Sequence, residues 1–303
     1  MGTTTVHGDP TRSRERPTRC SRIVTQVAAT ETMGGDEPPS FEGFCAVCGW
    51  AGRFCSSGEV PGRVSRDFQC GGCGSPLVYQ AEAGAILDAY AVGAVGCLDD
   101  LVQDATFQER AVFHIGHAGP VRNRLKRLTN YEESCFDATL PRGELVQARP
   151  RRTNQDHQRL TFADDRFDLL VSSHVLEHVP VPRAALVEAH RTLKPGGRYI
   201  FSIPGNLGHH ESVIRAGYDD GRLVHHLPPR YHHSPEGEPA LVFTDFGTDL
   251  LDLLHDVGFV AFVDRPHRPI RRARQNFVIV AIKAPRRRRM RAWRTAITRR
   301  PST

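Results

Sequence analysis

The fold is decided by the stretch LTFADDRFDLLVSSHVLEHVP, residues 160–180, in which an apolar run ends in two serines and a histidine. Residues 166–172 contain the continuous apolar core Leu-Leu-Val, which predicts a strand buried on both faces of a parallel sheet. A helix is expected at 183–194, because the Pro-Gly-Gly sequence after it cannot continue the helical ladder. A second apolar strand follows at 198–203. The order strand, helix, strand is typical of a parallel sheet with crossover helices.

The same alternation extends on both sides of this stretch. Further strands are expected at 111–115, 259–263 and 277–282, and further helices at 121–128 and 249–257. Before them, residues 81–110 carry apolar side chains at helical spacing and are expected to form a helical linker. The pattern therefore predicts a doubly wound α/β domain over 111–284 that closes with a hairpin.

Residues 160–180, followed by the sequence LKPGGR and a strand that ends in Pro204, closely resemble the central block of type-11-like methyltransferases. The resemblance covers roughly 112–284 and includes weaker matches at 227–232 and 242–247. It implies a class I fold, which is a Rossmann-like, doubly wound sheet of seven strands, with S-adenosylmethionine as the cofactor. It also implies an enzyme that moves a methyl group to an oxygen, nitrogen or carbon nucleophile.

The same resemblance places the cofactor at the carboxyl ends of the strands, where glycine lets the backbone come close to it. The residues that match the family's cofactor positions are Gly116 and Gly119 in the first turn, Asp137 for the ribose hydroxyls with Glu133 in reserve, Asp156 and the backbone N–H of His157 for the adenine, and Ser172 and Ser173 at the strand end. The first turn departs from the family's acid-x-Gly-x-Gly-x-Gly pattern, because His114, Ala118 and Pro120 occupy three of its positions. This departure leaves a second function open, that of a catalytically inactive adaptor with a methyltransferase fold.

Two histidines of the deciding stretch, His174 and His178, are the candidates for proton transfer beside the acceptor. With Glu177 they also match the spacing of an inverted zinc-protease motif, so a metallohydrolase is a further alternative. That alternative needs both histidines on one helix, whereas His174 directly follows a predicted strand. A histidine-rich segment lies at 209–233, where this fold usually inserts its substrate lid. The resemblance favours, as substrate-side candidates, His225, Tyr231 and His232.

Four of the eight cysteines form two CxxC pairs, Cys45 with Cys48 and Cys70 with Cys73, which are separated by 21 residues and each followed by glycine. Four thiolates complete a tetrahedral zinc shell, which predicts a structural Zn²⁺ site in a zinc-ribbon-like module at 41–80. Free or disulfide-linked cysteines are the alternative. The module has little apolar content of its own, so metal binding is expected to supply part of its stability.

The net charge of +6 over 303 residues arises at the C-terminus. Residues 285–303 carry eight arginines and no acid, which leaves 32 basic against 34 acidic residues elsewhere. A general nucleic-acid surface is therefore not expected, and a small molecule or glycan is the expected acceptor. For the tail itself, a solvated disordered or helical segment is favoured over binding to nucleic acid or an anionic surface.

The N-terminal residues 1–40 are rich in Thr, Arg, Gly and Pro and are expected to be a disordered arm. Neither a secretory signal nor a transmembrane segment is expected, because no apolar run reaches about 18 residues. Eight cysteines without such a signal point to a reducing compartment, so a cytoplasmic location is expected.

Overall fold

The computed structural model describes residues 40–58, 67–116, 118–204, 209–233, 239–264 and 276–285. The expected disordered arm at 1–40 and the basic tail at 285–303 lie almost wholly outside these described residues. Among the helices that are described, none combines the length and the apolar character needed to cross a membrane.

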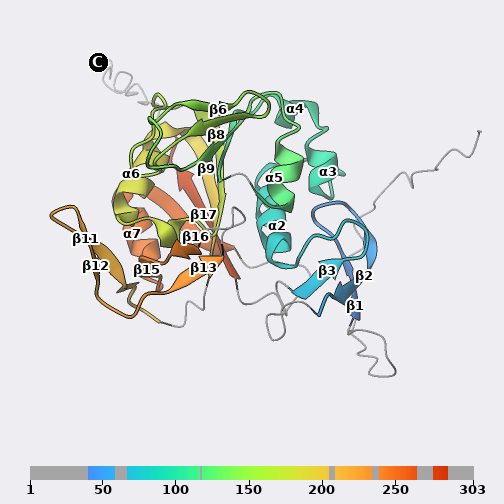
Figure 1. Ribbon diagram of the computed structural model, residues 1–303. Helices are drawn as coiled ribbons and strands as arrows, with labels where there is room; N and C mark the ends of the chain where they lie inside the picture. The colour runs from blue at the N-terminus through green and yellow to red at the C-terminus, as the bar shows by residue number, and fades with distance from the viewer. Residues whose placement is uncertain are drawn as a thin grey trace, which may run out of the picture.

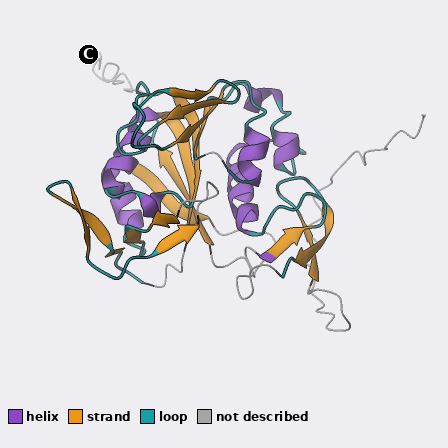
Figure 2. Ribbon diagram, in the orientation of Figure 1, coloured by secondary structure: helices purple, strands orange, loops and turns teal. Residues whose placement is uncertain are grey.

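An eight-stranded sheet forms the centre of the molecule (Figures 1 and 2), in the order β16-β17-β9-β8-β4-β5-β7-β6. In chain order its strands are β4 (Val112–Ile115), β5 (Tyr131–Cys135), β6 (Leu145–Gln147), β7 (Arg151–Asn154), β8 (Phe167–Ser173), β9 (Leu193–Pro204), β16 (Phe259–Asp264) and β17 (Asn276–Lys283). The strands from β9 to β7 run parallel, and β17 inserts antiparallel between β9 and β16. The expected doubly wound sheet with a terminal hairpin is confirmed.

The central sheet has eight strands, one more than the seven that were expected. The additional strand, β6, pairs antiparallel with β7 at the edge of the sheet and with an irregular register. The loop before it is held by Asn154, whose side-chain amide donates to the carbonyls of Asp137 and Leu140 at 2.9 Å each. Leu145 and Val146 of this region are exposed, so β6 has no buried face that a sequence pattern would reveal.

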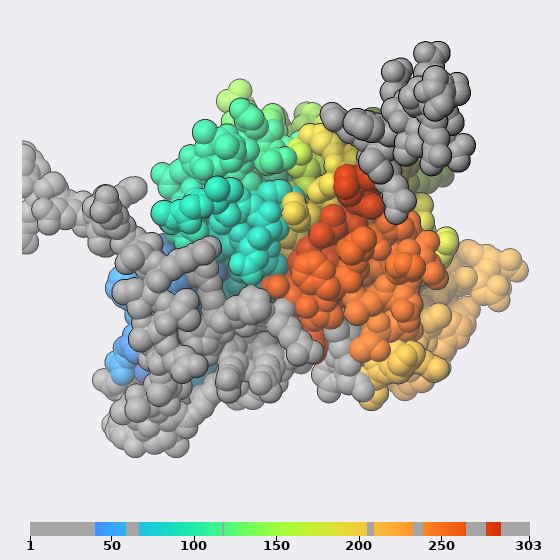
Figure 3. Space-filling model, turned by 180° about the vertical axis from the view of Figure 1, so that it is seen from behind, coloured from blue at the N-terminus to red at the C-terminus, as the bar shows by residue number. Residues whose placement is uncertain are grey.

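Two helical layers cover the sheet, one on each face (Figure 2). The helices are α2 (Val78–Tyr90), α3 (Leu98–Leu101), α4 (Ala105–Gln108), α5 (Pro120–Leu125), α6 (Pro182–Thr192) and α7 (Leu250–Val257). Because successive side chains of a strand point to opposite faces, Val112 and Leu169 join the core under α2, α3 and α5. Their neighbours Phe113 and Leu170 join the second core, under α6 and α7. From behind, the α2–α5 layer lies beside the C-terminal strands (Figure 3).

The segment 81–110 is not one continuous helix. Helix α2 ends at Tyr90, and the chain turns at Gly93, whose φ of +70° favours glycine. Helices α3 and α4 are then single turns, and Asp104 caps α4 by accepting from the backbone N–H groups of Thr106 and Phe107. The apolar spacing that predicted one helix therefore belongs to separate helices.

Helix α6 also ends two residues earlier than expected, at Thr192. Strand β9 begins directly at Leu193 and includes the Pro-Gly-Gly sequence, so it is longer than the predicted 198–203. Gly197 allows this path, because a Cβ atom there would lie 2.8 Å from the carbonyl oxygen of Lys194. The close approach of backbone to backbone excludes a side chain at this position.

The N-terminal module is a three-stranded antiparallel sheet of β1 (Ser40–Phe44), β2 (Ala51–Ser56) and β3 (Phe68–Cys70). Its buried side chains belong to the same core as α2 and one face of the central sheet. Two hydrogen bonds span the junction: the N–H of Ala46 donates to Oε1 of Gln80, and the N–H of Leu98 donates to the carbonyl of Ala46, both at 2.8 Å. The module is thus continuous with the α/β domain (Figure 1).

Between β9 and α7 the described residues form three two-stranded sheets. They pair β10 (Val213–Ile214) with β15 (Thr244–Asp245), β11 (Ala216–Asp219) with β12 (Arg222–His225), and β13 (Tyr231–His233) with β14 (Pro239–Leu241). We call residues 209–233 and 239–245 the lid segment; its β11–β12 hairpin projects from the body (Figure 1). The N–H of Phe243 donates to the carbonyl of Glu177 at 2.8 Å, which fastens the lid segment to the turn after β8.

Candidate functional site

The carboxyl ends of β4 and β8 are neighbours at the centre of the sheet and mark its switch point. The chain leaves β4 toward β5 and β7 on one side and returns to β8 and β9 on the other. Because the connections diverge there, doubly wound sheets bind ligands outside these carboxyl ends. The first residues after the two strands, Gly116 and His174, therefore border the candidate site.

The turn after β4 requires its two glycines for different reasons. Gly116 has a φ of +94°, and a Cβ atom there would meet nothing closer than Val175, at 4.0 Å. The space in front of Gly116 is therefore open to a ligand. Gly119 has a φ of +97°, and a Cβ atom there would lie 2.9 Å from the ring of Tyr79. This second glycine lets α2 and α5 pack closely.

The departures from the family pattern are accommodated within the turn itself. The imidazole of His114 is buried, and its Nδ1 lies 3.0 Å from the carbonyl oxygen of Gly116. Pro120 occupies the first position of α5, where a missing N–H costs no helical hydrogen bond. Neither residue closes the space beside Gly116.

The two acids near the end of β5 have different surroundings. Glu133 is buried and accepts hydrogen bonds from Arg122 and Arg152 at 2.7 and 2.8 Å, so its carboxylate is committed to ion pairs. Asp137 is exposed and accepts from the N–H and hydroxyl of Thr139 at 2.8 and 2.6 Å, which hold its pKa below the ordinary value. The geometry favours Asp137 as the carboxylate that is available to a ligand.

The two candidate residues after β7, Asp156 and His157, also differ in their surroundings. Asp156 is partly exposed and accepts from the N–H of Gln158 at 2.9 Å. The ring of His157 is buried edge-on against Tyr199, with centroids 5.9 Å apart, and its nitrogens have no hydrogen-bond partner among the described residues. Burial lowers the pKa of His157 to about 4, although the carboxylates of Asp156 and Glu188 oppose the shift. The side chain of His157 is a neutral core group, and only its backbone is suited to contact a cofactor.

The two serines at the end of β8 point to opposite faces of the sheet. The hydroxyl of Ser172 lies 2.7 Å from that of Tyr199, and the hydroxyl of Ser173 donates to Glu82 at 2.6 Å. Glu82 belongs to α2 and is fully buried, with Ser202 as a second donor at 3.2 Å. Sequence reasoning missed Glu82, because a single acid in a predicted linker helix resembles an ordinary solvated residue.

A cluster of histidines surrounds Glu177 just beyond β8. His174 has a left-handed φ of +54°, and Leu176–His178 form a single 3-10 turn, η1. The helix that the metallohydrolase alternative requires is therefore not formed. His232 reaches the cluster from β13 of the lid segment, and its Nδ1 lies 3.6 Å from Oε1 of Glu177. Spacing along the sequence could not associate His232 with Glu177.

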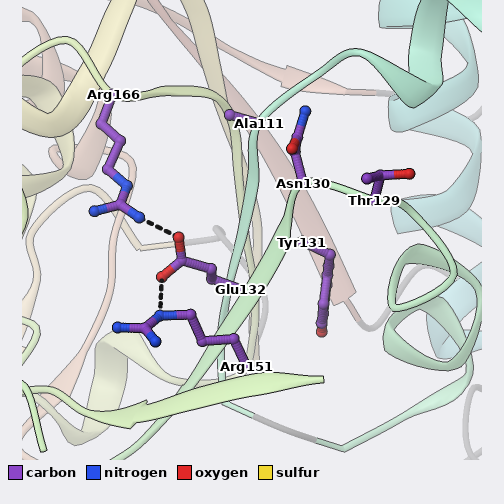
Figure 4. Close-up of a pocket in the computed structure, with 7 residues that line it drawn as sticks. All are labelled: Ala111, Thr129, Asn130, Tyr131, Glu132, Arg151 and Arg166. Carbon is purple, nitrogen blue, oxygen red and sulfur yellow. Dashed lines mark hydrogen bonds and ion pairs between the residues drawn. The ribbon is translucent and has the colours of Figure 1, made fainter. Parts of the chain in front are cut away.

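A separate hollow of about 310 Å³ lies at the opposite, amino edge of the sheet (Figure 4). It is lined by Ala111, Thr129, Asn130, Tyr131, Glu132, Arg151 and Arg166. Glu132 pairs with Arg151 at 3.2 Å and also with Arg166, so the charged groups of the hollow pair with one another. Its place at the starts of the strands separates it from the switch point, and its chemistry is that of surface ion pairs.

The four predicted zinc ligands converge in the N-terminal module. The sulfurs of Cys45 and Cys73 lie 3.8 Å apart, as do those of Cys48 and Cys70. A tetrahedron with zinc–sulfur bonds of about 2.3 Å has edges of about 3.8 Å, so the cluster fits this ion. Side-chain and backbone N–H groups, from Gln80 to Cys45 at 3.4 Å and from Gly72 to Cys70 at 3.3 Å, would stabilise the thiolates.

Comparisons with known proteins agree with this architecture. Residues 116–201 match the family model described as a methyltransferase domain. Demethylmenaquinone methyltransferase of Mycolicibacterium paratuberculosis is 35% identical over 112 residues, or 34% of this chain and 49% of that protein. Ubiquinone biosynthesis O-methyltransferase of Coxiella burnetii is 34% identical over 70 residues, or 23% of this chain and 30% of that protein.

The chain spans about half the length, or less, of these curated relatives. Among solved structures, an S-adenosylmethionine-dependent methyltransferase of Mesorhizobium loti has 17% sequence identity and a TM-score of 0.38. The similarity covers 57% of this chain and 90% of that chain.

The sheet order, with the inserted antiparallel strand β17 and the open turn after β4, defines a Rossmann-like methyltransferase fold. The family match runs from that turn to β9 and thus includes the switch point. Residues 116–201 are thus similar to a methyltransferase domain, and a zinc-ribbon-like module precedes the matched region.

Proposed function

We propose that this chain binds S-adenosylmethionine at the switch point and transfers its methyl group to an oxygen, nitrogen or carbon nucleophile. The observation that carries the proposal is the position of the family match, which begins at the turn after β4 and includes the end of β8. Those two strand ends border the place where doubly wound sheets bind their ligands.

The proposed cofactor contacts follow from the groups that remain available. Gly116 borders open space, so its backbone can come close to the cofactor. The exposed carboxylate of Asp137 suits the ribose hydroxyls, and Asp156 with the N–H of His157 suits the adenine. Ser172 and Ser173 would contribute through their backbone, because both hydroxyls already have partners.

When bound, S-adenosylmethionine supplies a methyl carbon on a sulfonium, which is a good leaving group. The task of this chain is therefore to align an acceptor atom with that carbon and to receive the acceptor's proton. His174 and His178 are the proposed proton acceptors, since both follow β8 at the carboxyl edge. The Nδ1 of His178 lies 2.8 Å from the carbonyl of Leu241, which leaves Nε2 as its basic atom.

A small molecule or glycan is the proposed acceptor. The nearly neutral charge of the chain without its tail argues against a nucleic acid. The names of the curated relatives, which refer to demethylmenaquinone and ubiquinone biosynthesis, also favour a small molecule. Exposed apolar side chains on the lid segment, among them Ile214, Tyr218 and Leu223, would suit a partly apolar acceptor.

We further propose that Cys45, Cys48, Cys70 and Cys73 bind one structural Zn²⁺. The proposed organisation is a zinc-ribbon-like module at 41–80, a helical linker at 81–110 and the methyltransferase domain at 111–284. The cytoplasm is the proposed location, because it would keep the four thiols reduced and able to bind metal.

Isothermal titration calorimetry of the full chain with S-adenosylmethionine tests the central proposal. We expect one binding site with a Kd in the micromolar range, and competition by S-adenosylhomocysteine. Failure of both compounds to bind would favour the alternative of an inactive adaptor, which the departures at His114 and Pro120 support.

A further inference from the structure

One carboxylate oxygen lies at the centre of three histidines. Oε1 of Glu177 is 3.6 Å from Nε2 of His178, 3.6 Å from Nδ1 of His232 and 3.7 Å from Nδ1 of His174. These distances exceed those of hydrogen bonds, and neither oxygen of Glu177 has a hydrogen-bond partner among the described residues. The side chain of Glu177 is only 1% exposed, so solvent does not supply the missing donors.

A hydrogen bond of His178 determines which of its ring nitrogens carries the proton. Its Nδ1 lies 2.8 Å from the carbonyl oxygen of Leu241, which can only accept, so Nδ1 carries the proton. In the neutral ring, Nε2 then presents a lone pair toward Oε1 of Glu177. Two lone pairs at 3.6 Å repel each other, and a cation bound by both atoms would remove this repulsion.

We propose that Glu177, His178 and His232 bind a divalent transition-metal ion of the Zn²⁺ or Fe²⁺ kind. Their ligand atoms all lie within 4.8 Å of one another, and ions of this kind bind nitrogen and oxygen at about 2.0–2.2 Å. Two imidazoles and one carboxylate are a donor set that these metals favour, and it leaves coordination positions open. The bond from His178 to Leu241 is the outer contact that commonly orients a metal-bound histidine.

The site joins two parts of the chain that are distant in sequence. Glu177 and His178 lie in η1 after β8, whereas His232 comes from β13 of the lid segment. A bound ion would therefore fasten the lid segment to the carboxyl edge of the sheet. Its open positions would accept an oxygen atom of an incoming ligand and lower the pKa of a bound hydroxyl. As a ligand, Nε2 of His178 would no longer serve as a base, so His174, which lies outside this ligand set, would be the remaining proton acceptor.

Metal titration of the tag-free full chain, without S-adenosylmethionine, tests this site independently of the proposed function. The chain is stripped with a chelator and reloaded with Co²⁺, which reports its ligands by absorption. The four-cysteine cluster would give thiolate-to-cobalt charge-transfer bands, whereas a site of nitrogen and oxygen ligands gives only weaker d–d bands. We expect both signatures, and two cobalt ions per chain by native mass spectrometry.

Two variants remove the proposed ligands, His232→Ala and the nearly isosteric Glu177→Gln. We expect each to lose the nitrogen–oxygen signature, with Co²⁺ affinity at this site reduced by more than about 100-fold, and to keep the thiolate bands. His226→Ala, which changes an exposed histidine of the same lid segment, should bind as the wild type does. The proposal is overturned if the wild type shows only thiolate bands, or if Glu177→Gln retains both ions.

Discussion

The hydroxyl of Ser173, the last residue of β8, lies 2.6 Å from Oε2 of Glu82, a fully buried residue of α2. Ser202 of β9 donates to the same oxygen at 3.2 Å. Burial raises the pKa of Glu82 to about 7, although both hydroxyls oppose the shift. This contact joins α2 to two parallel strands directly below the candidate site.

Folding stability should therefore depend on pH through Glu82. Its pKa is about 7 in the folded state against 4.5 ordinarily, so the folded state holds the proton more tightly. The resulting stabilisation is complete below about pH 4.5 and is lost as the pH rises through about 7. Between pH 5 and 8 we expect the wild type to lose about 2 kcal/mol more stability than Glu82→Gln in urea unfolding. Glu42→Gln, at an exposed site in β1, should follow the wild type, and equal losses in all three proteins would contradict this role.

Asp137→Ala should weaken binding of S-adenosylmethionine by about 10-fold or more, because the ribose hydroxyls would lose a charged acceptor. Calorimetry of the variant measures the change. Asp219→Ala removes an exposed carboxylate at the end of β11 and serves as the control. An affinity equal to that of the wild type would remove Asp137 from the proposed site.

Asp156→Ala should weaken the same binding by about 5-fold to 10-fold, through the loss of one hydrogen bond from the adenine amino group. The variant Asp156→Asn keeps an acceptor oxygen and should bind more tightly than Asp156→Ala. Unchanged affinity in Asp156→Ala would reject the adenine assignment, whatever the result for Asp137.

Gly119→Ala should destabilise the fold more than Gly196→Ala does. Both glycines have positive φ, at +97° and +84°, so both substitutions carry backbone strain. Only at Gly119 would the new Cβ atom also approach the Tyr79 ring, at 2.9 Å. We expect a difference of about 1–2 kcal/mol in urea unfolding. Equal destabilisation would mean that the contact with Tyr79 relaxes freely.

Cys45→Ser should abolish tight zinc binding by the four-cysteine cluster and lower the melting temperature of the whole domain. The second effect is expected because the module shares a core with α2 and the sheet. Zinc release to a colorimetric chelator and thermal unfolding measure the two effects. Cys55→Ser, which changes a cysteine of β2 outside the cluster, should alter neither.

The parts of the fold that could be predicted are those with a strong local signal. Strand β8 was predictable because a central parallel strand is buried on both faces and therefore contains a continuous apolar run, here Leu169 to Val171. Helix α7 was predictable from its apolar spacing and from Gly258, which ends it with a φ of +110°. Strand β6 and the division of 81–110 into several helices escaped prediction, because edge pairing and helix packing depend on distant residues.

The residues of the candidate site, like the elements of the fold, were only partly predictable from the sequence. Among the acids near β5, the choice between Glu133 and Asp137 depended on Arg122 and Arg152, which approach Glu133 only in the folded chain. No sequence pattern pointed to Glu82, because its burial results from the packing of α2 on β8 and β9. Such contacts are set by tertiary packing rather than by local propensity.

The sequence by itself determined the class of fold and the four-cysteine cluster, because strand burial and CxxC spacing act over a few neighbouring residues. Only the tertiary structure decided which polar groups remain available at the switch point and that His232 meets Glu177. The physical reason is that hydrogen bonds and metal contacts act over a few ångströms, so residues far apart in the chain interact only once the sheet and the lid segment have brought them together.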